Sequence, residues 1–336
     1  MEYYKRLTFD FNHKIELFDY IKGMAILFVI MTHNISEEIR STLLFCLWGQ
    51  LAVPLFLLIT TALFFRNGFP LYYSYTTHVK KLWKRALKPY LIFVLIIALI
   101  SLLTKTETFD SALEKIFRNG GFGPGNYYIP MFACYSLILP ISSFFLESQK
   151  KQTIGIVLII VISMLSINYL PFFIYRILPI RYLMLIPLGY IWATKGVNLN
   201  CKTISLSLLS VVSLLVFHYS SIDFSPIFYT ILPWDYANWI CYFWPAFTLP
   251  FIFNYFYSIS SCYFNRLICY LGKRSLQILF TQMAVFYYVE KGMLQFMSHN
   301  QLLFIIISTF LSIAPIVTYD TARTLFYENN REDLWK

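Results

Sequence analysis

The sequence predicts an all-α integral membrane protein with about ten transmembrane helices. Hydrophobic residues make up 58% of the 336 residues and charged residues only 13%, whereas soluble domains average roughly 45–50% and about 25%. The mean hydropathy is +0.60, and the apolar residues gather in long runs that match the thickness of a bilayer. These observations exclude a soluble globular fold, a disordered chain and a disulfide-stapled secreted domain.

Each predicted helix is an apolar run close to the roughly 20 residues that cross about 30 Å of hydrocarbon. In chain order, the ten runs lie at about 17–35, 43–65, 86–104, 127–146, 153–171, 175–194, 203–220, 237–259, 275–291 and 301–322. The fourth, sixth and ninth are interrupted by proline or by charged residues. Solid runs, rather than ten-residue alternation, favour helices over the strands of a membrane barrel.

The basic residues favour an even number of spans. If the amino terminus is cytoplasmic, 19 of the 27 Lys and Arg residues fall in cytoplasmic segments, seven fall outside, and Lys22 lies within the first run. This is the asymmetry described by the positive-inside rule. Both termini are therefore predicted to be cytoplasmic, and the net charge of +10 orients the helices.

The segments between the runs show no separate soluble domain. The two longest, 66–85 and 105–126, are expected to be loops, and the second holds four glycines and a proline between 120 and 125, which favour irregular structure. The first run lacks a small-x-small cleavage site, so we expect a retained helix rather than a signal peptide. The six cysteines form no metal-binding spacing, and we expect no metal site.

Three ionisable side chains lie within the first run: Asp19, Lys22 and His33. A Lys or Asp there costs about 2.5–3.5 kcal/mol on insertion. Lys22 and His33 are eleven residues apart, which at about 100° per residue places them on one helix face and about 16 Å apart along the axis. Asp19 precedes Lys22 by three residues and can pair with it. Alternatively, Asp19 and Lys22 reach back to the cytoplasmic surface and His33 lies among the outer headgroups.

A second polar feature is the basic run at 78–90, where the third span begins. Its cations could hold an anionic, phosphate-bearing ligand or a lipid headgroup. An ordinary positive-inside anchor explains the same pattern. Most of the Tyr and Trp residues elsewhere are expected at the membrane interface and in helix packing.

The segment 16–33 resembles the opening of the acyltransferase 3 family of multi-pass membrane enzymes. In that family an Asp precedes a basic residue and Gly, and an apolar run then ends in His, as Asp19, Lys22, Gly23 and His33 do here. Four later segments resemble the family in the same order, at 53–56, 81–90, 127–140 and 271–282. The resemblance covers most of the chain and implies a single acyltransferase 3-like transmembrane domain over residues 1–336.

The resemblance implies O-acyl transfer, commonly of acetyl from cytoplasmic acetyl-CoA to a hydroxyl of a surface polysaccharide or a lipid-linked saccharide. His33 is then the expected general base, because an imidazole with a pKa of about 6.5 can take the hydroxyl proton at neutral pH. Lys22 would contact the donor or polarise its thioester carbonyl, and Asp19 would hold Lys22 in place.

Binding roles follow from the same resemblance. The anionic donor would be held by cations of the basic run, namely Lys81, Lys84 and Arg85, with Lys88 as an additional contact. The acceptor would be contacted at the outer mouth by Tyr127 and Tyr128. Acetyl-CoA is expected as a co-substrate, with no tightly bound cofactor. The expected partners are the lipid bilayer, acetyl-CoA and a glycan acceptor, but no nucleic acid, in the cytoplasmic (inner) membrane of a bacterial cell.

The chain departs from the family pattern at two places. The late motif usually ends in His, and here that position is Gln282, which can hydrogen-bond the acceptor but cannot transfer a proton at neutral pH. Thr60 and Thr61 stand where the family has a Ser-Gly pair. If the reaction needs a second imidazole, activity or substrate is altered; if His33 is the sole base, nothing is lost.

Two other interpretations fit the sequence. A multi-pass transporter, flippase or saccharide polymerase of envelope glycan assembly would also combine many spans with intramembrane charges. A transporter often shows two related halves, which this sequence does not, and a flippase for anionic lipids is expected to carry cations in several spans. The other interpretation is a catalytically impaired family member that acts in an assembly, suggested by Gln282 alone.

Overall fold

The computed structural model describes residues 8–9, 15–35, 39, 42–66, 75–170, 174, 177–223, 239–297 and 301–333. Within these residues the chain is helical apart from connecting turns and one small antiparallel pair of strands, which confirms the all-α prediction. The strands are β1 (Thr8–Phe9) and β2 (Val197–Asn198), and Phe9 lies opposite Val197.

The helices and helical turns have the following bounds in chain order. They are α2 (Ile15–Asn34), the 3₁₀ turns η2 (Phe45–Leu47) and η3 (Gly49–Leu51), α4 (Ala52–Arg66), α5 (Tyr75–Leu82), the π-helical segment η5 (Trp83–Leu87), α6 (Lys88–Leu103), α7 (Phe109–Phe117), α8 (Tyr128–Leu146), α9 (Gln149–Tyr169), the 3₁₀ turn η6 (Pro179–Tyr182), α11 (Leu185–Thr194), α12 (Cys201–Asp223), the 3₁₀ turn η7 (Trp239–Tyr242), α14 (Phe243–Phe247), α15 (Leu249–Ile259), α16 (Cys262–Lys273), α17 (Ser275–Met297) and α18 (Gln301–Asp333).

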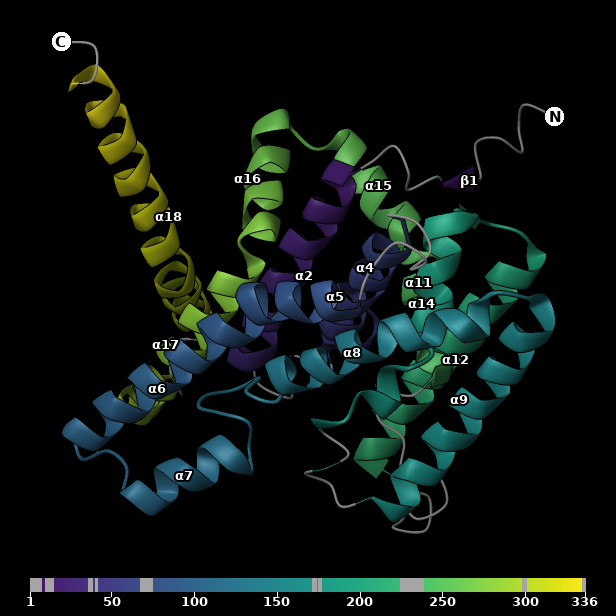
Figure 1. The fold of residues 1–336 in the computed structure, drawn as a ribbon, viewed down its shortest axis with the longest axis horizontal. Helices are drawn as coiled ribbons and strands as arrows, with labels where there is room; N and C mark the ends of the chain where they lie inside the picture. Colours follow the sequence, from purple (N-terminus) through teal and green to yellow (C-terminus); the bar gives the residue numbers. More distant parts are fainter. Residues whose placement is uncertain are drawn as a thin grey trace.

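Helix α2 lies at the centre of the bundle. It packs against α16, α4, α17, α18 and α15, and it is surrounded by them in Figure 1. Leu17, Ile21, Ala25 and Ile30 of α2 are all buried, since a helix that is apolar on every side is stable only inside a bundle or a membrane. Asp19, Lys22 and Thr32 of α2 are partly buried between these helices, whereas Glu16 and His33, near the two ends of α2, are exposed.

Five of the described helices are long and apolar enough to cross a membrane. Their bounds are Phe45–Arg66, Tyr75–Leu103, Tyr128–Leu146, Gln149–Ser166 and Leu303–Thr324. They coincide with the spans predicted at 43–65, 86–104, 127–146, 153–171 and 301–322. The protein is therefore a multi-pass membrane protein.

The other five predicted spans are not among these five helices, so ten spans and cytoplasmic termini stay predictions. The run at 17–35 is α2, which carries Glu16, Asp19 and Lys22, and the run at 275–291 is α17. Within α12 (Cys201–Asp223), the described residues Cys201–Val216 form an apolar helix. The predicted span at 175–194 forms one continuous helix only over α11. The predicted span at 237–259 is divided into η7, α14 and α15. Residues 175–176 and 237–238 lie outside the described residues.

The expectation of loops at 66–85 and 105–126 was wrong for 75–85 and 109–117, which are helical, whereas 118–126 is irregular as predicted; residues 67–74 lie outside the described residues. In the first segment α5 and η5 extend α6 backwards into one continuous helical stretch from Tyr75 to Leu103. In the second segment α7 begins after Thr108, whose side chain accepts a hydrogen bond from the Ser111 amide and so caps the helix. Figure 1 shows α7 beyond the far end of α6, at the opposite edge of the molecule from β1 and the C-terminal end of α18.

Candidate active site

The three ionisable residues of α2 lie as the helical spacing predicted. Lys22 Nζ is 2.7 Å from Asp19 Oδ1, and the two side chains are 23% and 13% exposed. The predicted Asp19–Lys22 pair is therefore confirmed, and the carboxylate offsets the cost of a partly buried ammonium group. His33 is exposed in the last turn of the same helix.

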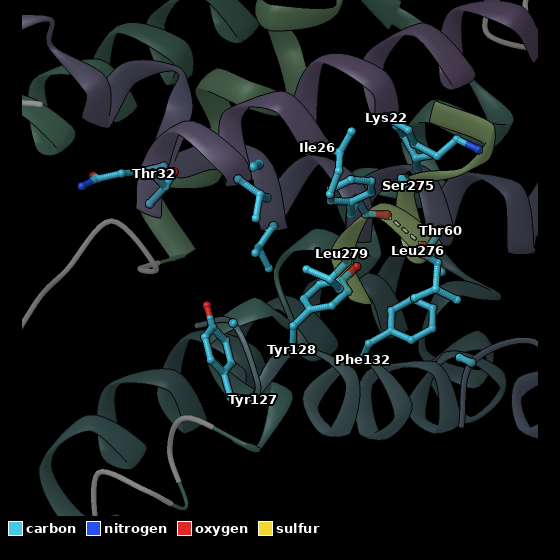
Figure 2. Close-up of a pocket in the computed structure, with 18 of the residues that line it drawn as sticks. Lys22, Ile26, Thr32, Thr60, Tyr127, Tyr128, Phe132, Ser275, Leu276 and Leu279 are labelled. Carbon is cyan, nitrogen blue, oxygen red and sulfur yellow. Dashed lines mark hydrogen bonds between the residues drawn. The ribbon is translucent and has the colours of Figure 1, made fainter. Parts of the chain in front are cut away.

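A cavity of about 370 Å³ runs along α2 and is lined by both Lys22 and His33. Three other predicted site residues line it as well: Arg85, Tyr127 and Tyr128. Figure 2 shows Lys22 and Thr32 toward opposite ends of the α2 segment, with Tyr127 nearer the Thr32 end and Phe132 nearer the Lys22 end. The cavity thus brings residues of α2, α4, η5, α8 and α17 together around one space.

The position of Lys22 is set by a close crossing of α2 and α16. A Cβ on Gly23 would lie 2.0 Å from the Ile268 carbonyl oxygen, and one on Gly272 would lie 1.8 Å from the Asp19 carbonyl oxygen. Only glycine allows the two backbones to approach this closely. The Lys-Gly pair of the first motif and the Gly-Lys pair of the late motif therefore meet at one helix crossing beside the cavity.

Cys269 lies next to this crossing, on α16 in the predicted cytoplasmic segment. Burial, together with the nearby Asp19 and Glu16 carboxylates, raises the pKa of the Cys269 thiol to about 11. The thiol therefore stays protonated at neutral pH and is a poor nucleophile.

The basic run contributes Arg85 to the cavity through a local change of helix type. In η5 the Lys88 amide donates to the Trp83 carbonyl, five residues back, and such π-segments occur frequently at functional sites. Arg85 and Ala86 of this segment line the cavity. Lys81, Lys84 and Lys88 are exposed and do not line it.

The glycine-rich segment 120–126 borders the His33 end of the cavity. A Cβ on Gly125 would lie 4.0 Å from His33 Nε2, and one on Gly123 would lie 2.3 Å from the Met283 carbonyl oxygen of α17. The Tyr90 hydroxyl donates to the Gly120 carbonyl and, at 3.0 Å, to the Asn126 carbonyl. These contacts hold the segment against α6, through Tyr90, and against α17, through Met283.

The mouth at this end is aromatic. The His33 ring centroid lies 6.0 Å from that of Phe286, and the Arg181 guanidinium lies 5.2 Å from the Tyr127 ring centroid. Toward the Lys22 end of the cavity, Phe132 stacks on Tyr128 with ring centroids 5.9 Å apart (Figure 2). Flat aromatic faces of this kind suit the apolar faces of a sugar ring as well as they suit lipid.

Gln282 is fully buried on α17 and does not line the cavity. Neither its amide nitrogen nor its amide oxygen has a hydrogen-bond partner among the described residues. At about 100° per residue it lies on nearly the same face of α17 as Leu279, which lines the cavity, and Phe286, which contacts His33. Its predicted contact with the acceptor stays a prediction.

The sequence did not single out three polar residues that line the cavity, namely Thr32, Gln50 and Ser275, and it noted Thr60, which also lines the cavity, only as a departure from the family pattern. Thr32 and Thr60 donate their hydroxyl protons to the carbonyls of Phe28 and Phe56 within their own helices. Ser275 belongs to the late motif at 271–282, which was the available signal, but that motif alone does not show which of its residues reaches the cavity.

Comparison with known proteins gives one match. A family model described as an acyltransferase domain matches residues 15–319. No curated protein matches the chain, and no solved structure matches it. The matched range contains every element that lines the cavity.

Proposed function

The chain belongs to the acyltransferase 3 family and is a membrane acyltransferase; from this premise we propose that it is an O-acetyltransferase. Acetyl would pass from cytoplasmic acetyl-CoA to a hydroxyl of a surface polysaccharide or a lipid-linked saccharide, in the inner membrane of a bacterial cell. The observation that carries the proposal is one cavity lined by Lys22, Arg85 and His33, with Lys22 and His33 eleven residues apart on α2.

His33 acts as the general base in this proposal. The acceptor oxygen attacks the thioester carbonyl carbon while the imidazole takes its proton, the carbon–sulfur bond breaks, and the imidazolium returns the proton to the thiolate of CoA. An imidazole with a pKa of about 6.5 is suited to both transfers at neutral pH. The exposure of His33 at the cavity mouth leaves room for an acceptor.

Lys22 binds the donor rather than polarising its carbonyl. Eleven residues of helix place the backbones of Lys22 and His33 about 16 Å apart, which is too far for the ammonium group to touch a carbonyl held beside His33. Arg85 lines the same cavity, and its neighbour Ala86 packs with Phe132 and Leu276, which lie nearer the Lys22 end in Figure 2; anionic groups of the donor would enter at this end. The Asp19 contact at 2.7 Å holds Lys22 in place.

The apolar wall between the two ends suits the arm of the donor. Ile26 and Val29 of α2, Phe56 of α4 and Leu279 of α17 line this stretch. An extended acyl-pantetheine arm lying along them would carry the thioester from the cytoplasmic side to His33. Excluding water from this wall also protects the thioester from hydrolysis.

A His33→Ala variant tests the proposal. We expect it to insert and fold normally but to lower acetyl transfer by about 10²–10⁴-fold, the usual contribution of a general base. The measurement is mass spectrometry of O-acetyl groups on envelope glycans from deletion cells that express the wild type, the variant or nothing. The same comparison identifies the acceptor.

His78→Ala is the matched control. Its ring nitrogen lies 2.9 Å from the Ser136 carbonyl oxygen on the α5–α8 side, away from the cavity, so acetylation should be retained. Unchanged acetyl content in the His33 variant would remove His33 from the mechanism. Unchanged acetyl content in the deletion cells would refute O-acetylation of these glycans.

A further inference from the structure

Helix α7 divides into three longitudinal arcs with different surroundings. At about 100° per residue, Phe109, Leu113 and Phe117 fall within one arc of about 80°. Asp110, Glu114 and Arg118 occupy the adjacent arc. The remaining positions, 111, 112, 115 and 116, face the body of the protein, as their contacts show.

Glu107 links the protein-facing arc of α7 to the helix bundle. The Ser111 hydroxyl donates to Glu107 Oε2 at 2.5 Å, Lys115 forms an ion pair with Glu107, and the Tyr287 hydroxyl of α17 donates to Glu107 Oε1 at 2.7 Å. Ala112 is buried beside these groups. The orientation of α7 about its axis is therefore fixed.

The apolar arc faces outward. Phe109, Leu113 and Phe117 are 64%, 36% and 80% exposed. The neighbouring polar arc carries an ion pair in which Arg118 Nη1 lies 2.8 Å from Glu114 Oε1. An apolar arc beside a charged arc, both turned away from the protein, is the pattern of a helix that lies at a boundary between lipid and water.

The apolar arc also continues a surface that faces lipid. Along α6, Leu95, Leu99 and Leu103 are 64%, 58% and 73% exposed, and they belong to a helix long and apolar enough to cross the membrane. This stripe ends where α6 ends, and α7 begins six residues later with Phe109. Figure 1 shows α7 just beyond that end of α6.

We propose that α7 is an interfacial helix that lies in the headgroup region of the bilayer, with Phe109, Leu113 and Phe117 turned toward the acyl chains. The leaflet is the one that the basic-residue asymmetry places on the extracytoplasmic side. The occupant of the apolar arc is the lipid surface itself. This holds whichever acyl group the enzyme transfers.

The position of α7 fixes the depth of the cavity mouth. The Gly121 amide donates to the Lys115 carbonyl at 2.9 Å, so the glycine-rich segment that borders His33 starts directly from the end of α7. With α7 at headgroup depth, the mouth beside His33 opens near the lipid surface, where a membrane-bound acceptor meets it.

Site-specific fluorescence in vesicles tests the proposal. The exposed native cysteines Cys201 and Cys262 are replaced by serine, and single cysteines at Leu113 and Phe117 are labelled with an environment-sensitive dye. Matched labels are placed at Asp110 and Glu114 on the polar arc. In phosphatidylcholine–phosphatidylglycerol vesicles we expect brominated lipid to quench the labels at 113 and 117 and aqueous iodide to quench those at 110 and 114.

Three results would overturn the proposal. Equal quenching by iodide at all four positions would place the apolar arc in water, and protection of 113 and 117 from both quenchers would mean that protein covers it. Amide hydrogen exchange of the unlabelled chain guards against disturbance by the dye: peptides from 109–117 should exchange more slowly in lipid nanodiscs than in detergent, and equal exchange would contradict the proposal.

Discussion

Adding one methyl group at Gly272 should displace the helix that carries Lys22. The new Cβ of Gly272→Ala would lie 1.8 Å from the Asp19 carbonyl oxygen, 2.7 Å from the Asp19 carbonyl carbon and 2.9 Å from the Gly23 nitrogen. All three are backbone atoms, so no side-chain rotation relieves the clash. Because real Cβ contacts essentially never fall below 3.0 Å, α2 and α16 must separate by about 1.2 Å.

This separation predicts a loss of activity larger than the loss of stability. Overpacking of this kind costs about 1–3 kcal/mol, which a membrane bundle can tolerate. A displacement of about 1 Å at a positioning element, however, costs about 10²-fold in rate, and Asp19 lies one helical turn from Lys22. We therefore expect Gly272→Ala to be present in membranes at near-normal levels and to transfer acetyl about 100-fold more slowly.

The assay is transfer of labelled acetyl from acetyl-CoA in isolated membranes, normalised to protein amount, together with the thermal midpoint of the purified protein. Gly155→Ala is the matched control, because it makes the same change within a helix but its Cβ would meet only the side chain of Phe145, at 3.1 Å. A wild-type rate and midpoint for Gly272→Ala would refute the close crossing of α2 and α16.

Three further predictions concern side chains around the cavity. Arg85→Gln should raise the KM for acetyl-CoA about tenfold, as expected for the loss of one charge-assisted contact, whereas Lys84→Gln, off the cavity, should change it less; equal effects would contradict donor binding by Arg85. Gln282→Leu should raise the free energy of unfolding by about 1–3 kcal/mol, measured by denaturation, because it removes a buried amide that has no partner among the described residues. The control Gln152→Leu loses a hydrogen bond to the Leu146 carbonyl and should lower the free energy of unfolding in the same assay. Alkylation of Cys269 by iodoacetamide should reach half its maximal rate near pH 11, because its raised pKa keeps the thiol protonated below that pH; a midpoint near pH 8.5 would show that the thiol is unperturbed.

The site features that depend on one helix could be predicted from the sequence. A rotation of about 100° per residue determines that Lys22 and His33 share a face and that Asp19 reaches Lys22, and the cavity lined by Lys22 and His33 and the 2.7 Å ion pair agree with both. These relations survive folding because no neighbouring element can change the spacing of residues within an unbroken helix.

Features that depend on packing between helices could not be predicted. Four cations of the basic run are equivalent in sequence, but the π-segment at η5 turns only Arg85 among them into the cavity. The run at 237–259 looks continuous in hydropathy, yet α14 ends at Phe247 and α15 restarts with Pro250 in its first turn, since proline has no amide hydrogen to continue the helix.

In the proposed mechanism the cavity has a fixed working length, because one unbroken helix carries both Lys22, proposed to hold the donor, and His33, proposed to deprotonate the acceptor. The length of donor that fits would therefore be set by the number of residues between Lys22 and His33 in α2, and no flexible loop could change it. Inserting a single residue between Lys22 and His33 would advance the imidazole by about 1.5 Å and rotate it by about 100°, out of the cavity. Under this mechanism, room for a longer or shorter acyl group would have to come from residues of the other elements that line the cavity, because the eleven-residue interval between Lys22 and His33 fixes their separation along α2.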